Sequence, residues 1–135
     1  MDLINFFELV LFSFLTGNND MHLKNFSVIH KSNGKIGLSP AYDLLNLNLI
    51  FKDDPDEVAL TLNGRKRTLT KNDFDVLGFN LGISGKAVEN VYKRFVGSRD
   101  KVKSMIERSF LPQDFQLEYL AIWDKKIKLF VSNPK

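Results

Sequence analysis

A nearly unbroken run of apolar residues opens the chain and limits what it can fold into. Across residues 3–15 this run is interrupted by Asn5 and Glu8. As a helix it would be apolar around nearly its whole circumference, and such a helix has to lie inside a larger body. The run is too short to span a bilayer, and it lacks the basic start and small-residue cleavage site of an export signal. We therefore predict a buried helix that Asp2 caps and that ends at residue 15 or 16.

Composition favours a single globular domain over residues 1–135. Hydrophobic residues make up 44% and charged residues 26% of the 135, and the mean hydropathy is −0.15. These values are typical of a soluble protein with a sizeable core. The net charge of +3 is small and its residues are interspersed, so we predict no direct binding to nucleic acid and no membrane segment. The absence of cysteine excludes disulfides and thiolate zinc sites and fits a cytoplasmic location.

Turn signals and periodicity divide the rest of the chain into two short hairpins and several helices. Ser32-Asn33-Gly34 predicts a turn between strands 26–31 and 35–39, and Asn63-Gly64 predicts one between 58–62 and 65–69. Segment 44–51 fits either a helix or a strand. Helices are expected from Thr70, from Ser84, over residues 100–109, and from Pro112 to about Phe130. The predicted fold class is α+β, mainly α-helical with two short β-hairpins.

Three further side-chain placements follow from these patterns. Tyr42 and Trp123 are expected in the core, and the Trp123 N–H then needs a hydrogen-bond partner. The lysines at positions 125, 126 and 128 are expected on a solvated face.

A polar loop after the first helix carries the residues that point to chemistry. Residues 17–25 read Gly-Asn-Asn-Asp-Met-His-Leu-Lys-Asn, so Asp20 stands five residues before Asn25, and Asp43 follows the first hairpin. A kinase catalytic loop has this order: one carboxylate accepts the hydroxyl proton, an amide binds metal, and a second carboxylate binds metal. We predict Asp20 as the base and Asn25 and Asp43 as ligands of Mg²⁺, which prefers hard oxygen atoms. The intervening hairpin would have to return Asp43 to the loop.

Other polar residues of the loop have two interpretations each. His22 could orient Asp20 or contact a phosphate, or it could be a neutral histidine bonded to backbone. Lys24 could neutralise phosphate charge, or it could be solvated. Asp20 and Asn25 could also serve only the turn, and Asp43 could cap the segment after it. The pattern of residues leaves these alternatives open.

Two longer strings closely resemble the C-terminal domain of the HipA family. They are residues 17–27 and residues 38–45, which read Leu-Ser-Pro-Ala-Tyr-Asp-Leu-Leu; residues 59–66 also look like the family. The D-x-H-x-x-N arrangement is similar to phosphatidylinositol kinase loops too, but the second string fits HipA better. HipA proteins are bacterial serine/threonine kinases that act as toxins in toxin–antitoxin pairs. The resemblance implies the C-terminal lobe of a HipA or protein-kinase-like fold.

By this resemblance, Asp20 matches the catalytic aspartate, and Asn25 and Asp43 match the magnesium ligands. His22 and Lys24 match polar positions of the family loop, which gives both an expected role in catalysis and Lys24 a role in binding the nucleotide. The implied cofactors are ATP and Mg²⁺. The implied partners are a HipB-like helix-turn-helix antitoxin and a protein substrate, for which the family's targets include aminoacyl-tRNA synthetases.

One departure from the family pattern tempers this expectation. No G-x-G-x-x-G and no strand with a candidate lysine precede the loop, so we expect a C-terminal lobe without the N-terminal nucleotide-binding lobe. We expect weak ATP binding, negligible activity in isolation, and cofactor binding only together with that lobe. The alternative function is a non-catalytic interaction module of kinase-lobe shape that binds an antitoxin or a separate N-terminal lobe.

Overall fold

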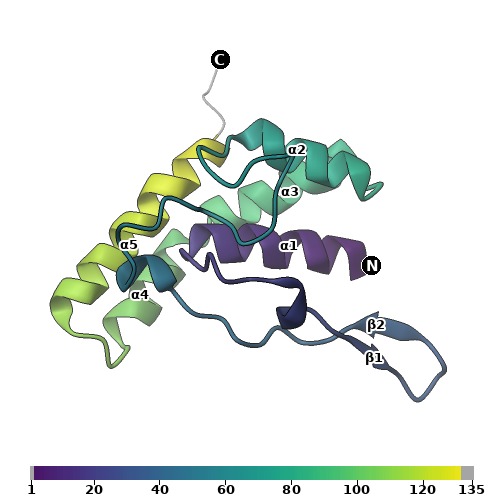
Figure 1. The fold of residues 1–135 in the computed structure, drawn as a ribbon, viewed down its shortest axis with the longest axis horizontal. Helices are drawn as coiled ribbons and strands as arrows, with labels where there is room; N and C mark the ends of the chain where they lie inside the picture. Colours follow the sequence, from purple (N-terminus) through teal and green to yellow (C-terminus); the bar gives the residue numbers. More distant parts are fainter. Residues whose placement is uncertain (1, 132–135) are drawn as a thin grey trace.

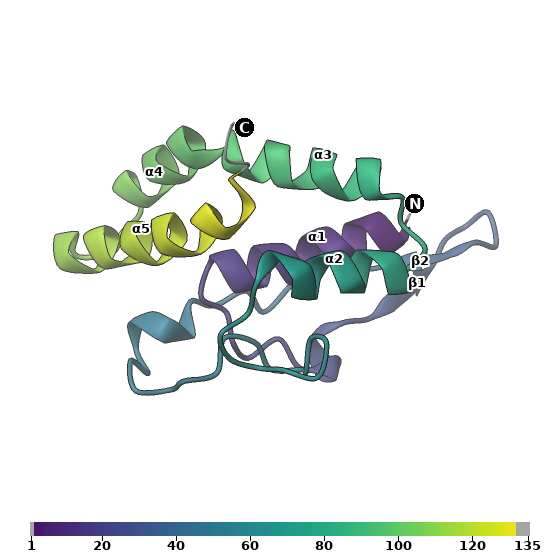
Figure 2. The same ribbon diagram turned by 90° about the horizontal axis from the view of Figure 1, so that it is seen from above.

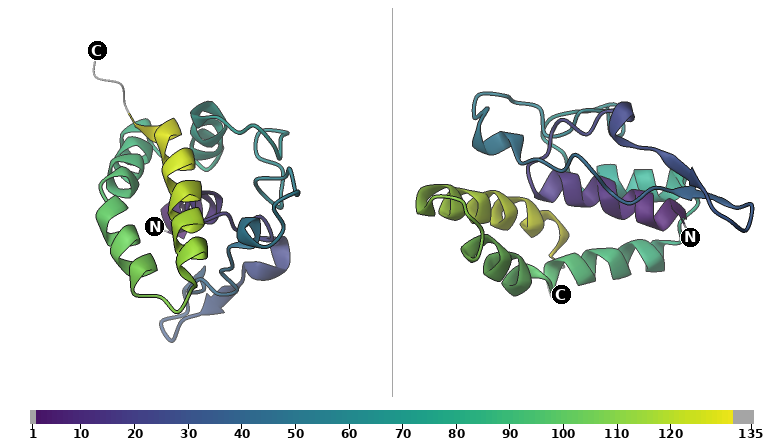
Figure 3. Two further views of the ribbon diagram at one scale, coloured as in Figure 1. Left: turned by 90° about the vertical axis from the view of Figure 1, so that its left-hand side faces the viewer. Right: turned by 90° about the horizontal axis from the view of Figure 1, so that it is seen from below.

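Helix α1 (Asp2–Leu15) lies at the centre of the molecule, as its apolar sequence predicts. Figure 3 (left) shows it surrounded by the other helices and by the irregular segment that follows it. The computed structural model describes residues 2–131. Four apolar side chains of α1 are buried and form the middle of the core: Phe7, Leu11, Phe14 and Leu15.

Four more helices pack around α1, close to the predicted positions. They are α2 (Lys71–Asn80), α3 (Gly85–Val96), α4 (Arg99–Glu107) and α5 (Gln113–Ile127), and α5 continues into a 3₁₀ turn, η3 (Lys128–Phe130). Helix α1 contacts α2 and α5, and α4 packs on α5 (Figures 1 and 2). Ser84 caps α3, because its side chain accepts a hydrogen bond from the Ala87 N–H at 3.3 Å. No helix in the described part of the chain is long and apolar enough to cross a bilayer.

Aromatic rings from four of these elements meet in the core. The Phe14 ring lies 5.0 Å from that of Phe74, and Phe130 lies 5.2 Å from Phe74 and 4.8 Å from Tyr92. Tilted and edge-on contacts of this kind stabilise a core beyond the area that they bury. Trp123 is buried as predicted, but its Nε1 donates to no acceptor among the described residues.

The start of α2 is held by a buried carboxylate. Asp73 accepts hydrogen bonds from the backbone N–H and the hydroxyl of Thr70, and from the Asn63 amide, each at 2.8 Å. Burial alone would raise the pKa of Asp73, but these hydrogen bonds and the charge of Arg65 hold that pKa below its usual value. Asp73 therefore completes a capping box with Thr70 and also fixes the Asn63-Gly64 turn against α2.

The sheet consists of one hairpin, not two. Strands β1 (Val28–His30) and β2 (Ile36–Leu38) pair antiparallel, within the predicted ranges, and the second predicted hairpin is reduced to a single bridge between Leu62 and Arg65. The turn forms there as predicted, but Thr68 has a φ of 50°, which an extended strand does not allow. The mainly helical α+β architecture is confirmed. Segment 44–51, for which the sequence fitted either a helix or a strand, forms neither and contains a short 3₁₀ turn, η2 (Leu47–Leu49).

Candidate active site

The 17–25 loop begins at a tight reversal of the chain after α1. Gly17 has a φ of 73°, its N–H donates to the Phe14 carbonyl at 3.2 Å, and the Asn18 N–H donates to the Ser13 carbonyl at 2.8 Å. This pair of bonds is a Schellman motif, in which a glycine in the left-handed conformation ends the helix. A Cβ atom at Gly17 would lie 2.6 Å from Oδ1 of Asn46, so the segment after Asp43 packs directly against the reversal.

Two buried asparagines hold the backbone just before Asp20. The Asn18 side chain accepts a hydrogen bond from the Asp20 N–H at 3.2 Å. The Asn19 amide donates to the Asp54 carboxylate at 2.9 Å and to the Asp56 carbonyl at 3.0 Å. Because these bonds lead in different directions from consecutive residues, the backbone at Asp20 is constrained from two sides.

Three of the predicted site residues come together in this loop. The Asn25 side-chain amide is buried and donates to the backbone carbonyl of Asp20 at 2.9 Å. His22 Nε2 lies 3.2 Å from the Asp20 carboxylate, and both side chains are partly open to solvent. The Asn25 bond favours the predicted closing of the turn, and the His22 contact favours its interpretation as the residue that orients Asp20. A carboxylate on a braced loop and open to solvent is suited to accept a proton.

The hairpin returns the chain to the loop, as the metal-site hypothesis requires. The Ser39 N–H donates to the Ser27 carbonyl at 2.9 Å, which extends the pairing beyond β2, and the Tyr42 hydroxyl donates to the Lys24 carbonyl at 3.0 Å. The prediction that Tyr42 belongs to the core is wrong, because its side chain is 40% exposed and serves this polar contact instead. Asp43 therefore follows a residue that touches the 17–25 loop.

Asp43 itself is exposed and has an unusual backbone. Its φ of 53° lies in the left-handed region, which costs energy for a residue with a Cβ and often marks functional positions. Among the described residues, neither the Asp43 carboxylate nor the Lys24 ammonium makes a hydrogen bond or ion pair. The predicted roles of Asp43 as a metal ligand and of Lys24 as a phosphate contact stay predictions.

The segment after Asp43 is tied back to Gly17 and to α5. The N–H groups of Leu47 and Asn48 donate to the Gly17 carbonyl at 3.1 and 3.2 Å. Lys126 of α5 donates from Nζ to the Phe14 carbonyl at 2.9 Å and to Oδ1 of Asn48 at 3.2 Å. One ammonium group thus joins the end of α1 to the segment that carries Asp43.

Lys126, which braces the segments beside the site, is a residue that the sequence interpretation placed wrongly. It is not on a solvated face: only 9% of it is exposed, and its Nζ lies 4.7 Å from the centre of the Phe14 ring. Its spacing was a usable signal, since the buried residues Trp123 and Lys126 of α5 and Phe130 of η3 recur at helical intervals. Burial lowers the pKa of Lys126 to about 8; the nearby Lys125 charge adds to this effect, and the Glu57 charge opposes it.

The lowered pKa of Lys126 makes a prediction about stability and pH. Between about pH 8 and pH 10.5 the unfolded chain keeps this proton and the folded chain releases it. The free energy of unfolding of the native chain relative to Lys126→Met should therefore rise with pH in this window, by up to about 3 kcal/mol. Urea unfolding of both proteins at several pH values measures this difference. A difference that stays constant or falls across the window would contradict a lowered pKa of Lys126 in the folded chain.

The donors available for a metal fit Mg²⁺ in kind. Because the Asn25 Nδ2 is used by the Asp20 carbonyl, its Oδ1 remains, and the exposed Asp43 carboxylate supplies a second hard oxygen. Within residues 2–131, no three His, Cys, Asp or Glu side chains are grouped closely enough to hold a metal ion by themselves. A site formed by Asn25 and Asp43 would accordingly need further oxygens from phosphates and water, as Mg²⁺ sites in phosphotransferases commonly do.

Comparison with known proteins identifies the class of domain. Residues 1–107 match the family described as HipA-like C-terminal domain, and the chain belongs to that family. This result confirms the resemblance read from the loop and the segment around Asp43.

Two similar proteins carry names that describe them as putative kinases. A Haemophilus influenzae protein named "Putative kinase" is 28% identical in an alignment 139 positions long. The alignment covers 91% of this chain and 40% of that protein. A Sinorhizobium fredii protein named "Putative kinase Y4dM" is 37% identical over 89 residues, which cover 64% of this chain and 22% of that protein. The chain thus spans less than half the length of the curated relatives that it matches.

A solved structure shares the fold. The match is a chain in the Shewanella oneidensis MR-1 complex of HipA, HipB and operator DNA, with a TM-score of 0.74 and 18% sequence identity. The similarity covers 93% of this chain and 30% of that chain. The arrangement of α1, the hairpin and the following helices is therefore that of a HipA C-terminal region.

Proposed function

We propose that residues 1–135 form the C-terminal catalytic lobe of a HipA-type serine/threonine protein kinase, which transfers the ATP γ-phosphate to a protein hydroxyl. The observation that carries the proposal is the arrangement around Asp20. Asn18 and Asn25 hold its backbone, and His22 lies 3.2 Å from its carboxylate. The Asp20 carboxylate accepts the proton of the attacking hydroxyl, and His22 keeps the carboxylate turned toward it.

The remaining site residues serve the nucleotide. Asn25 and Asp43 offer oxygens to Mg²⁺, and the exposed Lys24 offers a positive charge to a phosphate. When bound, the metal neutralises charge on the phosphates and fixes their position. The hydrogen bond from the Tyr42 hydroxyl to the Lys24 carbonyl holds the segment that carries Asp43 next to the loop that carries Asn25. Transfer requires a nucleotide-binding lobe that covers ATP from the other side. The C-terminal lobe by itself therefore binds ATP weakly and has negligible activity.

Binding of a paramagnetic metal tests the two ligands in this chain directly. On addition of Mn²⁺ and ATP at about 1 mM, a concentration suited to a weak half-site, amide NMR signals of residues 25 and 43 should broaden first. Asp43→Asn should remove this broadening because it removes the ligand charge, while asparagine tolerates the left-handed backbone at this position. Asp114→Asn, which changes an exposed carboxylate at the start of α5, is the matched control. Broadening that survives in the Asp43 variant, or that centres elsewhere, would contradict the metal assignment.

Phosphoryl transfer itself is tested with the chain produced together with a nucleotide-binding lobe, by following ³²P from labelled ATP into protein. We expect transfer only in the presence of both parts. Calorimetric titration of the 135-residue chain alone with magnesium–ATP should show no sub-micromolar binding; tight binding would show that the second lobe is not required.

A second function rests on exposed apolar side chains around the hairpin and the segment after Asp43. They include Val28, Ile36, Leu45, Ile50 and Phe51. Such a surface would suit a non-catalytic module that binds a HipB-like antitoxin or a separate N-terminal lobe. This chain shares its fold with a chain from a HipA–HipB complex, which supports an antitoxin partner for either function. A protein substrate, such as an aminoacyl-tRNA synthetase, is expected only if the chain is a kinase lobe. Co-purification with an antitoxin, without any transfer when the second lobe is present, would favour the interaction module.

A further inference from the structure

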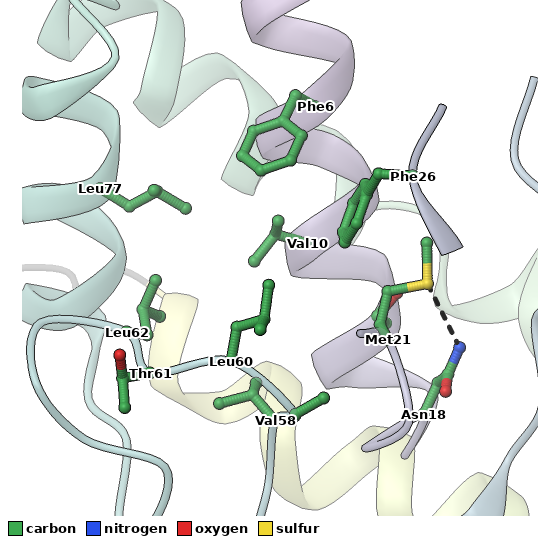
Figure 4. Close-up of a pocket in the computed structure, with 12 residues that line it drawn as sticks. Phe6, Val10, Asn18, Met21, Phe26, Val58, Leu60, Thr61, Leu62 and Leu77 are labelled. Carbon is green, nitrogen blue, oxygen red and sulfur yellow. Dashed lines mark hydrogen bonds between the residues drawn. The ribbon is translucent and has the colours of Figure 1, made fainter. Parts of the chain in front are cut away.

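An apolar cavity of about 120 Å³ lies between α1, the 17–25 loop, α2 and residues 58–62. Figure 4 shows its walls, in which rings and branched side chains from these elements face a common space. Its apolar lining includes Phe6, Val10, Phe26, Leu60, Leu62 and Leu77. None of the residues that line it is charged. Its volume is close to that of an engineered apolar cavity of about 150 Å³ that stays dry and binds benzene.

One polar group in the wall lacks a partner. Ser13 of α1 lines the cavity, is only 2% exposed, and its hydroxyl makes no hydrogen bond within the described part of the chain. A serine inside a helix commonly bonds back to the carbonyl four residues earlier, and a buried hydroxyl without any partner is unfavourable. The Ser13 hydroxyl is therefore available to a molecule that enters the cavity.

We propose that this cavity binds a small, uncharged, mainly apolar molecule with a single hydroxyl group, of the size and kind of phenol. The apolar walls would contact the ring, and the ligand hydroxyl would pair with Ser13 Oγ. A charged ligand is excluded because no side chain in the wall could compensate its charge after desolvation.

The cavity adjoins the proposed catalytic loop. Asn18 and Met21 also line it, and the Asn18 amide lies 4.0 Å from the Met21 sulfur, the contact drawn in Figure 4. Asn18 is the residue whose side chain holds the Asp20 N–H. An occupant would thus pack against Asn18 and Met21, which lie on either side of Asp20 in the sequence, and restrain the loop. Only this regulatory consequence rests on the proposed kinase function; binding itself does not.

Titration of the 135-residue chain with phenol, and separately with benzene, tests the site by amide NMR. We expect saturable shifts at residues 13, 18, 21 and 60 with a Kd for phenol of about 1 mM, and binding of benzene at least threefold weaker. Ser13→Ala should remove the preference for phenol and leave benzene binding intact, because it deletes the hydroxyl and preserves the walls. Ser104→Ala, on the exposed side of α4, is the matched control and should change neither affinity.

A variant with a filled cavity gives the opposing test. Val10→Phe should abolish binding of both ligands, and Leu77→Phe fills the cavity from α2 if the first variant does not fold. Three outcomes would each overturn the proposal. They are no saturable shifts in the native chain, shifts centred on α4 and α5, and an equal preference for phenol with and without the Ser13 hydroxyl. Because no nucleotide is present in this experiment, its failure is separate from any failure of phosphoryl transfer.

Discussion

Replacement of Asp20 by asparagine is expected to lower phosphoryl transfer by about 10²- to 10⁴-fold, the usual contribution of a general base. The experiment uses the chain assembled with a nucleotide-binding lobe and measures the rate of ³²P transfer. Asparagine keeps the size and most of the polarity of the side chain but cannot accept the hydroxyl proton. Because the Asp20 side chain is partly exposed and His22, at 3.2 Å, is the single polar partner of its carboxylate among residues 2–131, the free energy of unfolding should change by no more than about 0.5 kcal/mol.

Two further variants make this result specific. Asp114→Asn should leave transfer unchanged, since its carboxylate lies at the start of α5. His22→Gln should reduce transfer less than Asp20→Asn does, because histidine acts through the aspartate. Transfer by Asp20→Asn within about threefold of the native rate would remove Asp20 from the role of base.

A change of Gly17 to alanine should have the largest effect on stability. Its φ of 73° disfavours any residue with a Cβ, and the added methyl group would meet Oδ1 of Asn46 at 2.6 Å. Asn46 cannot easily move away, since the same oxygen accepts the Leu49 N–H. We expect a loss of about 3 kcal/mol, from the backbone and from overpacking together. Urea unfolding followed by circular dichroism measures the change.

Gly34 provides a matched control for this substitution. It has nearly the same backbone, with a φ of 76°, but a Cβ there meets nothing within 4 Å. Gly34→Ala should therefore cost only the backbone contribution, about 1 kcal/mol. Equal losses for the two alanine variants would show that the segment after Asp43 does not press against the reversal at Gly17.

The parts of the fold that sequence reasoning predicted are those with local causes. The all-round apolar run, the Ser84 cap and the Ser-Asn-Gly turn each specify structure within a few residues, and α1, α3 and the first hairpin formed where expected. Asn63-Gly64 also formed its turn. The strands beside it did not extend, because Thr68 adopts a left-handed backbone while the Glu57 carboxylate binds the Leu69 N–H, and neither is visible in a two-residue alternation.

The candidate site shows the same division. The proximity of Asp20, His22 and Asn25 follows from their closeness in one loop, and sequence reasoning predicted it. Tyr42 and Lys126 were misplaced because their partners, the Lys24 carbonyl and the Phe14 carbonyl, come from distant segments. The convergence of Asp43 with Asn25 on one ion stays a prediction, supported by the return of the hairpin to the loop.

The buried amine of Lys126 has a practical consequence for how this domain is delimited. The segment recognisable as family ends at residue 107, whereas the group that joins the Phe14 carbonyl to Asn48 sits nineteen positions later, on α5. A recombinant version trimmed to the recognisable segment would discard that anchor together with the Trp123 and Phe130 rings, and would expose the aromatic centre to water. The part of the chain that matches the family is therefore shorter than the part needed to complete the folded core. Truncated versions of such a lobe should keep α5 and η3.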